Sequence, residues 1–74
     1  MTPKFDPAAV TLRIKVAVER VGTVPDAAAA CDVKQATLEG LMRASSLPNC
    51  TTLAALCHGL DVSADWLLFG ELRP

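Results

Sequence analysis

The sequence is poor in aromatic residues and in histidine. It has no tyrosine, a single histidine at position 58, and only three aromatic side chains, Phe5, Trp66 and Phe69. Any core must therefore be built mainly from Ala, Val and Leu, and it must be thin. About half of the 74 residues are nevertheless hydrophobic (51%) and only 20% are charged, a composition that argues against disorder. We expect one small domain over residues 1–74.

The sequence also lacks an excess of positive charge. Its formal net charge is −1, whereas proteins that coat nucleic acid nonspecifically rely on surplus Lys and Arg to meet phosphates. The charge is uneven, however. Residues 1–43 carry six Lys/Arg and five Asp/Glu, a net charge of +1. Residues 44–74 carry one Arg and three Asp/Glu, a net charge of −2. This asymmetry is compatible with a protein that meets DNA with one face.

The three cysteines, Cys31, Cys50 and Cys57, are odd in number and contain no C-x-x-C pair. This favours reduced thiols in a cytoplasm over a disulfide framework. A zinc site is the alternative, but the neighbours Cys57 and His58 would point about 100° apart on a helix, so we expect no metal. We also expect a cytoplasmic protein, since there is neither a signal-peptide pattern nor an apolar run of about 20 residues.

No set of residues points to an enzyme. The chain has one histidine, no glycine-rich phosphate loop and no recognisable acid–base constellation, all of which are common elements of catalytic sites. We therefore expect no catalytic activity, no cofactor and no small-molecule substrate.

Five short helices are predicted, which gives an all-α fold with no strand and no repeat. In the first, at residues 6–22, apolar residues recur every three or four positions and Gly22 ends the helix. Its β-branched valines make a strand the competing interpretation, but the spacing favours a helix. The expected buried stripe is Val10, Ile14, Ala17 and Val21.

The remaining helices are marked by their ends. The second, at residues 23–31, starts with Thr23 as the cap, and its four alanines allow another helix to approach closely. The third covers residues 34–43 and the fourth residues 50–60, which Asn49 caps and Gly59 loosens at its end. The last, at residues 64–70, is capped by Ser63 and closed by Gly70.

The second and third helices have the spacing of a DNA-binding helix-turn-helix. Such a unit needs a small residue in its first helix, a residue in the turn that tolerates left-handed backbone geometry, an apolar residue directly after it, and buried positions in its second helix. The sequence provides all of these at matching offsets: Ala28, Asp32, Val33, Leu38 and Leu41.

The segment CDVKQATLEGLMRASSLPNCTTLAALCHGLDVSADWLLFGE resembles the helix-turn-helix domain of the lambda-repressor/Cro-like class, particularly small phage and prophage repressors. Their usual form is close to LGVSxxTLSxWxxGxxxPxxxxLxxIAxxLGVSxDWLLxGE. The resemblance implies a lambda-repressor-like fold and sequence-specific binding of double-stranded operator DNA by a homodimeric transcription regulator, with the third helix in the major groove. The matching positions are Val33, Thr37, Leu38, Pro48, Leu53, Leu60, Val62, Ser63, Asp65, Trp66, Leu67, Leu68, Gly70 and Glu71.

The chain departs from this family pattern at four positions. Val24 stands where the family often has a phosphate-binding Gln, and Lys34 stands where Ser commonly caps the third helix. Leu41 replaces an aromatic residue, and Gly40 replaces a polar or basic one. The departures concern DNA contacts more than the fold.

Base contacts are predicted on the outward side of the third helix. With Leu38 and Leu41 facing inward, this side comprises Lys34, Gln35, Ala36, Glu39, Gly40 and Arg43. Gln can pair with adenine, Lys or Arg with guanine, Glu can accept from cytosine, and Ala can touch a thymine methyl. The alternative is that Lys34, Glu39 and Arg43 form an ordinary solvated face, on which Glu39 and Arg43, four residues apart, could pair with each other.

Two further groups of residues are predicted to meet partners. Phosphate contacts are expected near helix starts and after the third helix, with plain helix capping as the alternative: Thr23, Thr37, Ser45, Ser46 and Asn49. A dimer surface is expected near the end of the chain, with packing into the core as the alternative: Trp66, Leu67, Phe69 and Leu72. The second functional hypothesis is a repressor-like scaffold that binds another protein and binds DNA weakly or not at all.

Overall fold

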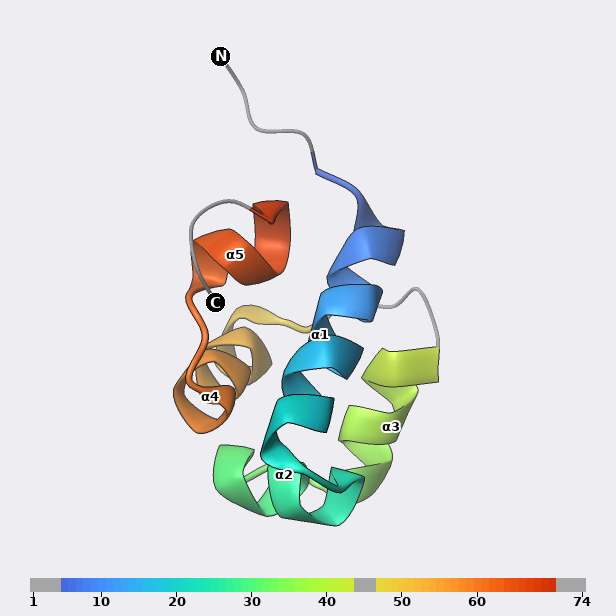
Figure 1. Cartoon of the computed structure of the whole chain (residues 1–74), viewed down its shortest axis with the longest axis vertical. Coiled ribbons are helices and arrows are strands. Elements are labelled where there is room, and N and C mark those ends of the chain that lie inside the picture. Colours follow the sequence, from blue (N-terminus) through green and yellow to red (C-terminus); the bar gives the residue numbers. More distant parts are fainter. Residues whose placement is uncertain (1–4, 44–46, 71–74) are drawn as a thin grey trace.

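The computed structural model describes residues 5–43 and 47–70, and within these ranges it contains five α-helices and no β-strand. The all-α prediction is therefore confirmed, and the strand alternative for the first segment is wrong. None of the helices in the described ranges is long and apolar enough to cross a membrane. The helices (Figure 1) are α1 (Pro7–Val21), α2 (Val24–Cys31), α3 (Gln35–Arg43), α4 (Cys50–Leu60) and α5 (Ala64–Phe69).

The starts of α1, α2, α4 and α5 are set by local side-chain caps. A cap side chain accepts a hydrogen bond from an N–H group that has no partner within the helix. The predicted caps Thr23, Asn49 and Ser63 all do this, and Asp6 does the same for α1. The distances from the backbone nitrogen to the side-chain oxygen are 3.1 Å from Ala8 to Asp6, 3.3 Å from Asp26 to Thr23, 2.8 Å from Thr52 to Asn49 and 3.1 Å from Trp66 to Ser63.

The turn between α2 and α3 has the predicted left-handed residue. Asp32 has φ 55° and ψ 45°. The chain turns at this residue because its own N–H group and that of Val33 both bond back to α2. The N–H of Asp32 reaches Ala28 and Ala29, and the N–H of Val33 donates to the carbonyl of Ala28 at 3.1 Å. This is the Schellman arrangement, which satisfies the last carbonyls of a helix.

The same local structure occurs a second time, between α4 and α5, which the sequence analysis did not predict. Asp61 is also left-handed, with φ 54° and ψ 52°, and the N–H of Val62 donates to the carbonyl of Cys57 at 3.1 Å. In each unit the leucine five residues after the valine is fully buried, at Leu38 and at Leu67. The turn after α2 and the turn after α4 are thus built alike, each with a left-handed aspartate followed by a valine whose N–H bonds back to the preceding helix.

Helix α1 lies at the centre of the molecule, where it packs against each of the other four helices (Figure 1). Its buried residues are Val10, Ile14, Ala17 and Val18. The prediction of Val21 in this stripe is wrong, because Val21 is the last residue of α1 and is 40% exposed. The chain leaves the helix at Gly22, before Val21 can be covered, and Val18 fills the core one turn earlier.

Helices α2 and α4 pack unusually closely, and Gly59 makes this possible. A Cβ atom at position 59 would lie 2.5 Å from the Cα of Cys31 and 2.7 Å from the carbonyl oxygen of Ala30. The prediction that Gly59 loosens the end of α4 is therefore wrong. Helix α4 continues to Leu60, and the backbone of α2 contacts α4 at Gly59.

Candidate nucleic-acid interface

Helix α3 has one buried side and one exposed side. Leu38 is fully buried and Leu41 is 7% exposed, and they hold the helix against α1 and α2. Of the other residues predicted for the core of this helix pair, Ala28 is buried and Val33 is half-buried against the core. A helix turns by about 100° per residue. Glu39 and Gly40, between the two leucines, must therefore point away from the core.

The residues predicted to contact bases lie on the exposed side of α3, except Lys34, which directly precedes the helix. Position 40 is half-buried, and a Cβ there would meet no atom within 4 Å. Gly40 therefore leaves a gap in a row of polar side chains instead of permitting a close contact. The exposed residues are Lys34, Gln35, Ala36, Glu39 and Arg43, together with Thr37, which was predicted to contact a phosphate.

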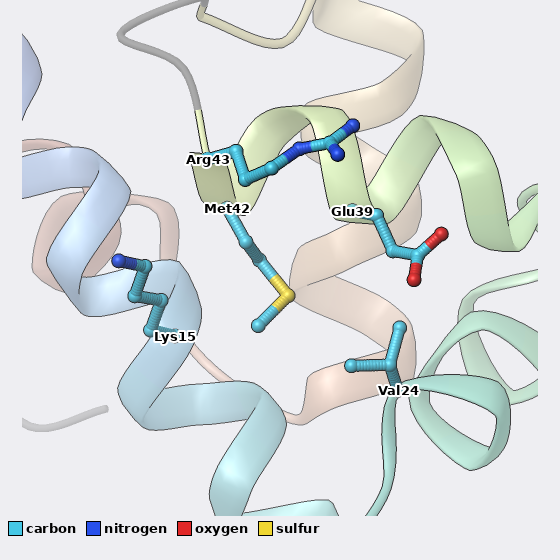
Figure 2. A pocket seen from close by; sticks show the side chains of 5 residues that line it. All are labelled: Lys15, Val24, Glu39, Met42 and Arg43. Carbon is cyan, nitrogen blue, oxygen red and sulfur yellow. The ribbon is translucent and has the colours of Figure 1, made fainter.

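Glu39 and Arg43 do not pair with each other, although their spacing allows it, and the alternative of an ordinary solvated face does not depend on that pair. Figure 2 shows the carboxylate of Glu39 and the guanidinium of Arg43 extending in different directions from α3, and neither residue has an ion-pair partner within the described part of the chain. Both charges are therefore available to a ligand that approaches this side of the helix.

The predicted phosphate contacts fall into two groups. Thr23 and Asn49 are exposed, and their side-chain oxygens cap α2 and α4, so the capping alternative is what the structure shows for both side chains. Ser45 and Ser46 lie outside the described residues. Thr37 is exposed on α3 and is not part of a cap, and it remains a predicted contact.

A pocket of about 260 Å³ lies beside this surface, between α1, α2 and α3. Met42 of α3 points into the space between Lys15 of α1 and Val24 of α2 (Figure 2), and Glu39 and Arg43 complete the lining. No pattern in the sequence predicts this pocket, because its walls are side chains of three helices that only tertiary packing brings together.

The predicted dimer surface at the end of the chain is only partly exposed. Leu67 is fully buried, so its assignment to a surface is wrong: α5 packs on α1 and α4 and turns Leu67 into the core. Trp66 and Phe69 are half-buried, and the ring of Phe69 lies edge-on to that of Phe5, with centroids 6.3 Å apart. Leu72 lies outside the described residues.

Two large apolar residues that were not predicted as a surface are exposed on the outer side of α1. Leu12 and Val16 are 59% and 48% exposed. Their four-residue spacing, on the side opposite the buried stripe, was the available signal. The interior side of α1 also holds an unpredicted contact, since Nη1 of Arg13 donates to the carbonyl of Leu67 at 3.3 Å and ties α1 to α5.

The cysteines lie in three different environments. Cys31 is buried, Cys57 is half-buried and Cys50 is exposed, and all three are free thiols. Burial raises the pKa of both Cys31 and Cys57, and the nearby Cys57 thiol raises the pKa of Cys31 further. Among residues 5–43 and 47–70, no three His, Cys, Asp or Glu side chains gather closely enough to hold a metal ion.

Comparisons of the chain with models of protein families, with curated proteins and with solved structures find no match. The functional interpretation therefore depends on the residues and geometry described above.

Proposed function

We propose that this protein is a sequence-specific double-stranded DNA-binding regulator that places α3 in the major groove. The observation that carries the proposal is the exposed polar side of α3, which directly follows the left-handed turn at Asp32 and is anchored by Leu38 and Leu41. A helix presented in this way suits the major groove, which admits one α-helix and displays a distinct pattern for each base pair.

The side chains on α3 provide both base and phosphate chemistry. Gln35 can make a bidentate contact with adenine, and Arg43 or Lys34 with guanine. Each good contact of this kind discriminates against the wrong base by about 1–3 kcal/mol. Glu39 is the only acidic residue on this side, and it would accept from the amino group of cytosine while repelling phosphate.

The weak positive charge of α3 favours action as a homodimer. Lys34, directly before α3, and Arg43 are the two cations on this side and Glu39 is the anion, so one copy would gain little from phosphate attraction. Two copies bound to half-sites about 34 Å apart would double the base contacts and bind with avidity. Such a dimer would act as a repressor-type transcription regulator of a bacterium or its phage.

The test is a duplex selection from random sequence, followed by a salt titration of the selected duplex and a scrambled one. We expect tight binding to the selected duplex that weakens as salt rises, with a slope worth several phosphates. Gln35→Ala and Arg43→Ala should each weaken binding by about 1–3 kcal/mol and relax the preference at one base position.

Arg20→Ala is the charge-matched control for Arg43→Ala. Arg20 is exposed on α1, and its loss should weaken binding to both duplexes equally and by less. The proposal fails if no duplex is enriched at low salt. It also fails if Gln35→Ala and Arg43→Ala leave duplex binding unchanged.

A protein-interaction module is the second candidate, and the exposed pair Leu12 and Val16 favours it. Apolar side chains of this size at adjoining positions of one helix are typical of contact surfaces. In that case Leu12→Ser with Val16→Ser would abolish capture of a partner protein and leave any duplex binding intact. Measuring both duplex binding and partner capture on this one double variant therefore distinguishes the two hypotheses.

A further inference from the structure

The outer surface of α1 carries two exposed apolar side chains one turn apart. Leu12 is 59% exposed, the highest value among the large apolar residues of the described ranges, and Val16 is 48% exposed. The preceding turn contains the small residues Ala8 and Ala9, which let a second helix approach closely. The residues predicted for a dimer surface at the end of the chain are, by contrast, buried or half-buried: Trp66, Leu67 and Phe69.

This outer surface lies between the two helices that flank α1. Arg13 donates to a backbone carbonyl of α5, and Lys15 lines the pocket beside α3. At about 100° per residue, Leu12 and Val16 both lie in the arc between Lys15 and Arg13. Figure 1 accordingly shows α3 and α5 on opposite sides of α1. The two apolar side chains therefore point away from the core, midway between α3 and α5.

We propose that this surface binds a second copy of the chain, with the two α1 helices packed antiparallel and Leu12 of each copy on Val16 of the other. Such a contact is isologous, so it closes at two subunits. Helix α1 has 15 residues and is therefore about 22 Å long. An interface of this length and one helix wide is smaller than the roughly 1,200 Å² of stable complexes. We therefore expect a weak dimer, with a dissociation constant on the order of 100 μM.

The charges on α1 favour a second copy in the antiparallel direction. When Leu12 lies opposite Val16, Arg20 lies opposite Ala8 of the second copy, about two residues from its Asp6. Arg20 forms no ion pair within the described residues. The exposed carboxylate of Asp6 caps α1 through Oδ1, which leaves Oδ2 for a cation.

Both members of this charge pair lie on the α5 side of α1. Arg20 is seven residues after Arg13, so helical geometry places the two on the same side. Asp6 directly follows Phe5, whose ring lies against that of Phe69 in α5. Two-fold symmetry then gives each dimer two pairs of Arg20 with Asp6. A parallel arrangement would instead place Arg20 beside Arg20 and lose both pairs.

The pairing would also place both copies of α3 on one face of the dimer, a consequence that rests on the function proposed above. The two-fold axis of two antiparallel helices is perpendicular to the plane that contains them. An element on one side of this plane in one copy therefore lies on the same side in the other, and α3 lies on the Lys15 side of α1. Two α3 helices on one face could meet two half-sites on one face of a duplex.

Sedimentation equilibrium of the whole chain without DNA measures the dimer directly. Val16→Ser removes two apolar side chains from each dimer and should raise the dissociation constant by about ten-fold or more. Val21→Ser is the matched control, because Val21 is 40% exposed at the end of α1 and lies about 180° around the helix from Leu12. Its dissociation constant should not change.

Three isosteric or near-isosteric charge changes test the direction of the pairing. Asp6→Asn keeps the helix cap, since Asn caps as well as Asp. Asp6→Asn and Arg20→Gln should each raise the dissociation constant by about two- to five-fold, and the double variant should dimerise no more weakly than either. Lys15→Gln removes the same charge as Arg20→Gln but from the α3 side, where the two Lys15 side chains approach each other. It should tighten the dimer or leave it unchanged.

An isotope-filtered NOE spectrum of mixed ¹³C-labelled and unlabelled chains identifies the contact without any variant. We expect cross-peaks between the Leu12 methyl groups of one copy and the Val16 methyl groups of the other. The proposal is overturned if the chain is monomeric at about 1 mM. It is also overturned if the intermolecular cross-peaks come from Trp66 or Phe69 instead, or if Val16→Ser and Val21→Ser dimerise alike.

Duplex binding separates this pairing from the proposed function. On the selected duplex, Val16→Ser should lower the affinity by up to about ten-fold, because the two bound copies no longer assist each other, whereas Val21→Ser should not. A dimer through α1 that selects no duplex would refute the proposed function and leave the pairing intact. An equal effect of the two variants on a selected duplex would refute the placement of both α3 helices on one face.

Discussion

Replacing Gly59 with alanine tests the packing of α2 on α4. The added Cβ would lie 2.5 Å from the Cα of Cys31, 2.6 Å from its Sγ and 2.7 Å from the carbonyl oxygen of Ala30. Two of these atoms belong to the backbone of α2 and cannot rotate away. The helices must therefore separate, and the core contacts of Ala27, Ala28 and Cys31 must loosen with them.

The expected effect is the difference between two opposing terms. Overpacking of this kind costs about 1–3 kcal/mol, and the backbone contacts place Gly59→Ala in the upper half of that range. Alanine also improves the intrinsic helix propensity over glycine by about 1 kcal/mol. We therefore expect Gly59→Ala to lower the free energy of unfolding by about 1–2 kcal/mol.

Gly40→Ala is the matched control, since it is the same substitution inside another helix. A Cβ at position 40 meets no atom within 4 Å, so only the propensity term applies and the free energy of unfolding should rise by up to about 1 kcal/mol. Urea unfolding with a common m-value would measure both variants, and the melting temperatures should move apart by roughly 4–8 °C for each kcal/mol. An equal or stabilising effect of Gly59→Ala would refute the close packing of α2 on α4.

Two further predictions concern the backbone turns and the thiols. Asp32→Val should lower the free energy of unfolding by about 1–2 kcal/mol, because a β-branched residue resists the left-handed conformation, whereas Asp32→Gly should be neutral or stabilising; equal urea midpoints for the two would contradict this. Burial raises the pKa of the Cys31 and Cys57 thiols above 9.0, so the folded state holds these protons more tightly than the unfolded state. Their contribution to stability is complete below about pH 9 and is lost as pH rises through the raised pKa values. Urea unfolding at pH 8 and at pH 10 should show this loss, Cys57→Ala should reduce it, and Cys50→Ser, at the exposed thiol, should leave it unchanged.

Much of the fold follows from local sequence. The bounds of the helices were predicted to within about one residue, because four of the five starts, those of α1, α2, α4 and α5, are fixed by a side chain that accepts from a nearby N–H group, as Asn49 does from Thr52. The turn at Asp32 was also predicted, since few residues accept left-handed geometry and a small residue four positions earlier completes the pattern. These interactions span only a few residues, so the sequence specifies them without knowledge of the neighbouring helices.

The predicted site was assembled from the same kind of information. Once Leu38 and Leu41 are assigned to the core, helical geometry alone turns Gln35, Glu39 and Arg43 outward, as the structure confirms. Their interaction with DNA stays a prediction, because exposure shows that a side chain is available and does not identify its partner.

Other features were decided only by how the helices pack. The sequence could not distinguish Gly59 as a contact point from Gly59 as a weak helix end, because the difference lies in the backbone of α2, nearly 30 residues earlier in the chain. Leu67 is buried because α1 and α4 meet α5 on that side, whereas its run of apolar neighbours left several orientations open. The pocket arises in the same way: Lys15, Val24 and Met42 come from three helices, and only the tertiary structure brings their side chains to one space.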